Sequence, residues 1–170
     1  MKTISPRRIL AAILLLALLL TALPIGVLAA ELSFTDVPKN EWYYEDVRLA
    51  VEGGLVNGKS PTIYAPNDNV TYAETVKLAA CIHKLTDTGS TEFAAGTVWY
   101  QPYVDYAKAH KLVWEADSAY NSPARRETFV TIFSYAMPEE ALNAINDVED
   151  GAIPDVAVSA AYAQSVYRFY

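Results

Sequence analysis

The hydrophobic positions beyond residue 30 recur at intervals typical of short amphipathic helices. Four stretches with helical spacing are expected to be helices: 43–52, 72–85, 102–110 and 125–137. The glycine pair Gly53-Gly54 can end the first, because glycine readily adopts positive φ. Pro102 suits a first helical turn, and Pro138 closes the last stretch. Turn-rich segments separate the stretches, so the pattern predicts a mainly α chain.

The chain also repeats itself. An offset of 57 residues places Trp42-Tyr43 on Trp99-Tyr100, and an offset of 119 places Phe34–Val37 on Ile153–Val156. We therefore divide the chain into a first unit at 32–86, a linker at 87–95, a second unit at 96–140, a linker at 141–152 and the start of a third unit at 153–170. Each complete unit is expected to be a helix–loop–helix.

Residues 1–29 have the pattern of a secretory signal peptide. A basic start is followed by a continuous apolar run at 9–22, a helix-breaking Pro24 and small residues before a cleavage site after Ala29 or Ala30. The alternative is an uncleaved membrane anchor. The run is shorter than the ~20 residues needed to span a bilayer, which favours cleavage and export of the mature chain.

Charge and composition narrow the classes of partner. The first 29 residues carry three basic residues and no acid, so without them the net charge moves from −7 to −10. All 20 aromatic residues lie in the remaining part, which is therefore an acidic, foldable domain. Such a balance argues against nucleic acid and anionic membranes as main partners. A single Cys excludes an internal disulfide and a Cys-based zinc cluster.

The motifs of residues 32–170 resemble the S-layer homology (SLH) domain. The likeness rests on Phe34-x-Asp36-Val37-Pro38, Trp42-Tyr43, Gly54-Leu55-Val56-Asn57-Gly58, Tyr64-x-Pro66-Asn67-Asp68-x-Val70 and Thr71-x-Ala73-Glu74, in that order. The resemblance implies tandem repeats in a pseudo-threefold, spindle-like arrangement, with the third repeat incomplete here. It also implies a cell-surface module that anchors an exported protein to the Gram-positive cell wall, by binding a pyruvylated secondary cell-wall polysaccharide attached to peptidoglycan.

The family signature at the start of the second helix is Thr-Arg-Ala-Glu, whose Arg is associated with the ketal carboxylate of the sugar. Here Tyr72 stands in the Arg position of the first copy, whereas the second copy, Ala124-Arg125-Arg126-Glu127, keeps Arg125 and loses the Thr. A helix N-terminus with an Arg suits a carboxylate. The candidate ligand-binding residues are Arg125, Trp42, Trp99, Tyr72, Glu74 and Glu127.

Each of these candidates also has a structural interpretation. Thr71 and Glu74 have the spacing of a capping box, which we expect to be their main role. Arg125 could instead form a solvated surface pair. The two tryptophans could stack on sugar, but we expect large aromatics ahead of a helix to close the core. Asp36 is expected to cap a turn.

The sequence offers no catalytic motif, and we predict a protein that is not an enzyme and needs no cofactor or metal. Cys81 and His83 are two apart on one helix, so they point in different directions. The acidic stretch 146–151 lacks the spacing of a calcium loop and is expected to be a linker. The alternative function is a surface protein–protein interaction scaffold with degenerate sugar-binding motifs.

The third unit has only its beginning in this chain. By the 119-residue offset, Tyr170 corresponds to Val51, which precedes the glycines that close the first helix of unit one. We therefore expect the natural product to continue through at least one more helix. A form longer by about 35 residues should be the more stable one, because a repeat core is built by stacking neighbours.

Overall fold

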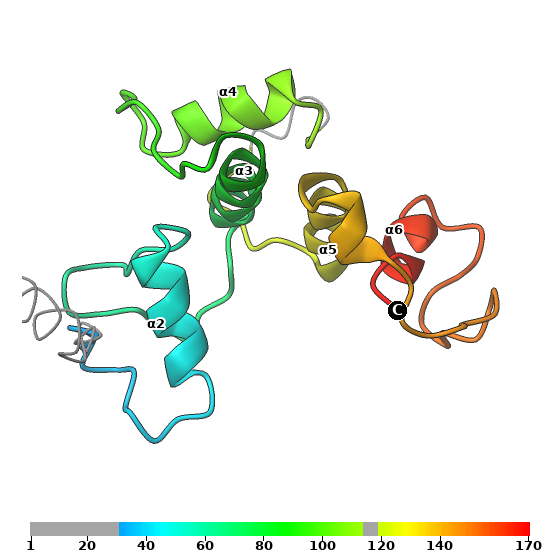
Figure 1. The fold of residues 1–170 in the computed structure, drawn as a ribbon, viewed down its shortest axis with the longest axis horizontal. Helices are drawn as coiled ribbons and strands as arrows, with labels where there is room; N and C mark the ends of the chain where they lie inside the picture. The colour runs from blue at the N-terminus through cyan, green and yellow to red at the C-terminus, as the bar shows by residue number, and fades with distance from the viewer. Residues whose placement is uncertain (1–30, 114–118) are drawn as a thin grey trace, which may run out of the picture. The chain divides into compact units, whose positions relative to one another are not determined.

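The computed structural model describes residues 31–113 and 119–170. Its helices in chain order are α2 (Tyr44–Glu52), α3 (Tyr72–Thr88), α4 (Gln101–Ala109), α5 (Arg126–Ala136), the 3-10 helix η1 (Glu139–Leu142) and α6 (Ala163–Tyr167) (Figure 1). In these two ranges the β-pairing consists of isolated bridges, Ser60 with Ile63 and Thr71 with Pro123. The mainly α class is confirmed. The predicted signal peptide, residues 1–29, lies outside the described residues.

The extensive helix contacts of the described chain join α3 to α4, α3 to α5 and α5 to α6 (Figure 1). In the predicted division, α3 is the second helix of the first unit and α4 is the first helix of the second unit. The same relation holds for α5 and α6. At both places, the second helix of one unit therefore packs against the first helix of the next unit. The pseudo-threefold arrangement stays a prediction.

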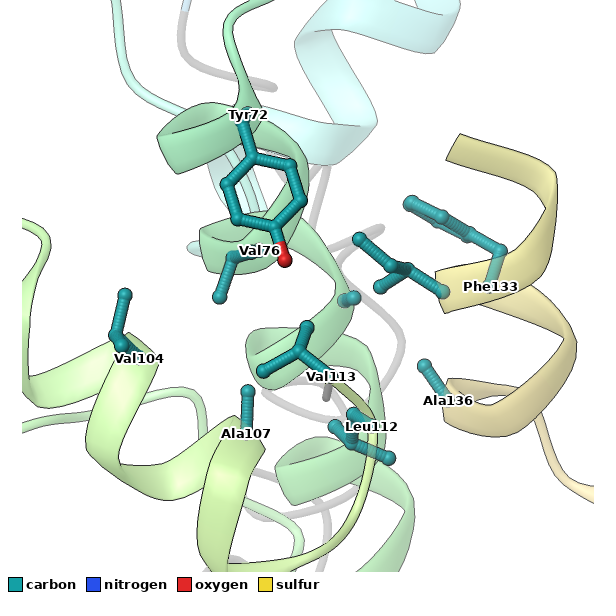
Figure 2. Close-up of a cluster of buried hydrophobic side chains, with 10 residues drawn as sticks. Tyr72, Val76, Val104, Ala107, Leu112, Val113, Phe133 and Ala136 are labelled. Carbon is teal, nitrogen blue, oxygen red and sulfur yellow. The ribbon is translucent and has the colours of Figure 1, made fainter. Parts of the chain in front are cut away.

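The main core is built from apolar side chains of α3, α4, α5 and the turn after α4. Figure 2 shows its labelled members facing one another: Tyr72, Val76, Val104, Ala107, Leu112, Val113, Phe133 and Ala136. Val76, Val104 and Leu112 are at most 1% exposed. Helices this short are marginal in isolation, so burial of these side chains, rather than helix propensity, stabilises them.

The turn that ends α2 recurs after α4. Gly54 has a φ of 68°, and the N–H of Leu55 donates to the carbonyl of Ala50 at 2.8 Å. At the position 57 residues further on, Lys111 has a φ of 58°, and Leu112 donates its N–H over the same distance of 2.8 Å. The helix stop predicted from the glycine pair is confirmed, and the later copy makes the same turn without glycine.

Asp36 fastens the start of the first unit to the loop before α3. Its carboxylate accepts the backbone N–H groups of Tyr64 at 2.9 Å and Ala65 at 2.6 Å. The Tyr64 bond, opposed by burial and helped by the Ala65 bond, lowers the pKa of Asp36. The same unit buries Val37 and Val47 in a small second core. The backbone partners of Asp36 lie 28 and 29 residues further on, so Asp36 joins two loops, and the expected capping of a turn stays a prediction.

The expectation of core burial is wrong for both tryptophans. Trp42 is 85% exposed and Trp99 is 50% exposed. Each indole packs edge-on against the next residue, Tyr43 or Tyr100, with ring centroids 5.5 and 5.4 Å apart. These tyrosines pack against the cores in place of the indoles. At both helix starts the indole stays outside and the tyrosine side chains that follow it turn inward, Tyr43 and the buried Tyr44 at α2 and Tyr100 at α4.

Helix α6 is tied to α5 and to the acidic segment 146–151. The hydroxyls of Ser134 and Ser165 share a buried hydrogen bond of 2.9 Å between the two helices. Arg168 donates to the Ser134 carbonyl, also at 2.9 Å. The N–H of Asn146 donates to the carbonyl of Tyr170 at 2.7 Å. The acidic segment therefore has a packing role beside the last helix.

Candidate functional site

The first turn of α3 is closed by its own capping box. The Thr71 hydroxyl accepts the N–H of Glu74 at 3.3 Å, and the Glu74 carboxylate accepts the N–H of Thr71 at 2.8 Å. The Lys59 ammonium donates to the other carboxylate oxygen. Burial raises the pKa of Glu74, but the hydrogen bonds from Lys59 and Thr71 outweigh burial and lower it. The predicted capping box is confirmed, and both oxygens of Glu74 are engaged.

A short backbone pairing, here called the seam, joins residues 70–73 to residues 120–124. Its hydrogen bonds run from Tyr72 N–H to the Ser122 carbonyl (2.9 Å), from Ala73 N–H to the Tyr120 carbonyl (2.8 Å) and from Ala124 N–H to the Val70 carbonyl (2.8 Å). Together with the capping box, the seam supplies acceptors for the first three N–H groups of α3. This helix start therefore has no donor left for an anion.

The side chain of Tyr72 lies inside the core. It is 9% exposed, and its ring packs 5.5 Å from that of Tyr120, which stacks 4.9 Å from Tyr100. The position at which the resemblance expects an exposed Arg thus carries a buried ring that braces the seam.

The first turn of α5 begins differently. Ala124, which corresponds to Thr71, has no side-chain acceptor, and the helix starts one residue later, with Arg125 as an N-cap whose side chain makes no capping hydrogen bond. The Arg125 side chain is 82% exposed, and its Nη1 lies 3.5 Å from Glu127 Oε1. Arg126 is exposed beside it. Two guanidinium groups thus lie at an uncapped helix N-terminus, where the helix dipole also favours an anion.

The six predicted site residues occupy three places. Tyr72 and Glu74 lie at the start of α3, and Arg125 and Glu127 lie at the start of α5. Trp42 and Trp99 lie at exposed positions just before α2 and α4. The seam brings the first two places together, since it pairs the residues that precede both helices. The ring contacts of the tryptophans are with Tyr43 and Tyr100, and the ion pair of Arg125 is with Glu127.

Two charged residues at these helix starts were not predicted. Arg126 follows Arg125 directly, so the adjacent basic pair was a visible signal. Lys59 pairs with Glu74 from a loop 15 residues earlier, and a single Lys in a polar loop gives no sequence signal for such a contact. The first unit therefore also holds a cation at its helix start, but its own carboxylate neutralises that cation.

Other chemistry in the described ranges is limited. They hold no group of three or more His, Cys, Asp or Glu side chains that could bind a metal ion. Burial, opposed by Lys77 and Lys84, raises the pKa of the Cys81 thiol, which is therefore a protonated core residue. None of the described helices has the length and apolar character required to cross a bilayer.

Comparisons with known proteins point to one family. Residues 33–76 match the S-layer homology domain, which supports the presence of this domain in the chain. Over 114 residues, 61% of this chain, it is 33% identical to the Surface-layer 125 kDa protein of Lysinibacillus sphaericus. The chain spans 10% of the length of that relative. No solved structure matches it.

The domain match and the surface-layer relative support a cell-surface anchoring module in general terms, with a location at the cell surface or cell wall. The matched segment contains the capping box of α3, whereas the exposed arginines lie beyond it, at the start of α5.

Proposed function

We propose that this chain anchors an exported protein to the Gram-positive cell wall by binding a pyruvylated secondary cell-wall polysaccharide at the first turn of α5. The observation that carries the proposal is the contrast between two helix starts. The start of α3 is closed by the capping box and the seam, whereas that of α5 has no side-chain cap and presents Arg125 and Arg126. A pyruvate ketal offers a planar carboxylate that suits a guanidinium fork.

The other candidate residues then take different roles. Glu127, 3.5 Å from Arg125, orients the guanidinium before the ligand arrives. Trp42 and Trp99 present exposed indole faces on which sugar rings stack. Tyr72 and Glu74 hold the seam and the capping box, so they support the site from within and do not contact the ligand.

The test is binding of the purified chain to cell-wall sacculi. Arg125→Ala should weaken binding by about 2–4 kcal/mol and leave the helix content unchanged, because the change removes an exposed charge and no packing. Arg125→Lys should restore only part of the affinity, since an ammonium cannot reproduce the planar fork. Binding isotherms on sacculi and circular dichroism of each variant measure the two effects.

The matched control is Arg48→Ala, which removes an arginine from α2, where Arg48 pairs with Glu45 and Glu52 at 2.8 Å. This variant should bind sacculi like the unchanged chain. Normal binding by a folded Arg125→Ala variant would refute the role given to Arg125.

A second candidate function is a scaffold for other surface proteins. The 85% exposed Trp42 and the 57% exposed Leu49 favour it, because they place apolar surface on and beside α2. Sacculi stripped chemically of the secondary polymer separate the two functions. The polysaccharide proposal expects binding to be lost with the polymer, and equal binding to both preparations would favour the scaffold.

A further inference from the structure

The chain has two histidines, and both lie at the contact between α3 and α4. His83 projects from α3 and His110 is the residue that ends α4, with ring centroids 5.0 Å apart. Tyr106 lies against both: its ring stacks on His110 at 4.0 Å, and its hydroxyl is 2.9 Å from Nδ1 of His83. We call these three side chains the imidazole cluster.

The cluster joins the two predicted units. Helix α3 belongs to the first unit and α4 to the second, and their packing forms one side of the main core. Phe93, from the segment between the helices, packs against Tyr106 at 5.3 Å and covers the cluster from a third direction. A change in the charge of the His83 ring therefore acts directly on the contact between the two predicted units.

The charged and titratable groups around His83 come from each neighbouring element. On α3, Asp87 lies one turn further on and favours the protonated ring, while the Lys84 ammonium lies 4.4 Å above the Phe93 ring. On α4, His110 disfavours protonation of His83, and the hydroxyl of Tyr106 bonds to it. Asp87 is thus the carboxylate that favours protonation of His83, and burial and His110 oppose it.

We propose that the imidazole cluster is a pH-sensitive clasp that holds α3 against α4 while the His83 ring is neutral and loosens when that ring is protonated. In the neutral form, Nδ1 of His83 and the Tyr106 hydroxyl share one hydrogen bond, and the tautomer of the ring decides which of them donates. Protonation makes Nδ1 a donor only, and it places a positive charge next to the His110 ring.

The sign of the pH effect follows from the burial of His83. Burial and the nearby His110 lower the pKa of His83, against the opposing pull of Asp87. The folded chain therefore binds this proton less readily than the unfolded chain, whose His pKa is about 6.5. The contribution of the cluster to stability is complete above that value, and it is lost as the pH falls from there toward the lower pKa of the folded state.

The experiment compares thermal unfolding of the whole chain at about pH 7.5 and about pH 5.5, a range above most carboxylate titrations. The melting temperature of the unchanged chain should fall by about 3–6 °C more than that of the double variant His83→Gln/His110→Gln. The Gln side chains keep polar contacts and cannot take a proton. An equal fall in both proteins would overturn the proposal.

A second measurement separates a clasp from ordinary packing. Because the chain has two histidines, their imidazole NMR signals can be followed through a titration without ambiguity. The pKa of His83 should lie below the usual histidine range in the unchanged chain, and it should move back toward that range in His110→Gln. If the pKa of His83 is the same in the unchanged chain and in His110→Gln, the proposal is overturned, whatever the melting temperatures show. The clasp depends on the α3–α4 contact and not on the sugar site proposed above.

Discussion

Lys111 holds a left-handed backbone with a φ of 58°, where the first unit has Gly54 with a φ of 68°. A non-glycine residue in this region costs roughly 1–2 kcal/mol. Lys111→Gly should therefore stabilise the chain, by about 0.5–1 kcal/mol after the larger backbone entropy of glycine in the unfolded state is subtracted. Urea unfolding followed by circular dichroism measures the change.

The control is the same substitution a few residues earlier. Lys108 lies within α4, in helical conformation, so Lys108→Gly should cost about 1 kcal/mol. Opposite signs for the two substitutions would show that backbone conformation decides the outcome. A loss of stability in both would contradict the strain assigned to Lys111.

Single residues differ in how far the sequence predicts them. The pairing of Thr71 with Glu74 was predictable, because it depends on two positions three apart in one helix turn. The exposure of Trp42 was not, since three adjacent aromatics lie at the start of that helix and only packing decides which of them turn inward. Arg125 was found as a candidate from the family pattern, but its place as an uncapped N-cap follows from the missing hydroxyl at Ala124.

At the scale of elements, Leu112 links the turn after α4 to the α3–α4–α5 core, in which it is 1% exposed. Leu112→Ala should destabilise the chain by about 2–5 kcal/mol, because it removes buried contacts and leaves a cavity among three helices. Denaturant unfolding gives the change in free energy.

Leu49→Ala is the matched control, since Leu49 is 57% exposed on α2. Its effect should stay within about 0.5 kcal/mol. Similar losses for the two substitutions would mean that the core described around Leu112 does not dominate stability.

The positions of the helices were easier to predict than the packing of one helix against another. Periodic apolar positions and stop signals gave all four expected helices, with α3 continuing to Thr88 rather than ending near Leu85. An amphipathic face does not specify which helix covers it, so the pairing of α3 with α4 could not be derived from periodicity. The seam had no sequence signal, because backbone hydrogen bonds leave no side-chain pattern.

At the scale of the whole molecule, net charge predicts an unusual salt response for the proposed binding. Residues 30–170 carry a net charge of −10, since the three basic residues and no acid lie before them. Two anionic partners repel each other at long range, and salt screens this repulsion over a Debye length of about 8 Å at physiological ionic strength. The association rate with the acidic polysaccharide should therefore rise with salt.

The dissociation rate should rise as well, because salt also weakens the contact between Arg125 and a carboxylate. Biolayer interferometry on immobilised polysaccharide at about 50 and 300 mM salt measures both rates. An association rate that falls with salt would show that local positive charge, and not the net charge of the molecule, governs the encounter.

The seam also sets an order of events as the chain is made. The carbonyl that pairs with Tyr72 N–H belongs to Ser122, about 50 residues later. Synthesis proceeds from the N-terminus, so α3 first forms with its capping box alone and with its first two N–H groups hydrated. A loop of about 50 residues must then close before the seam forms. The conformational entropy of this loop is lost before the new seam contacts can compensate for the loss. The first unit thus reaches its final hydrogen bonding only when the second unit arrives.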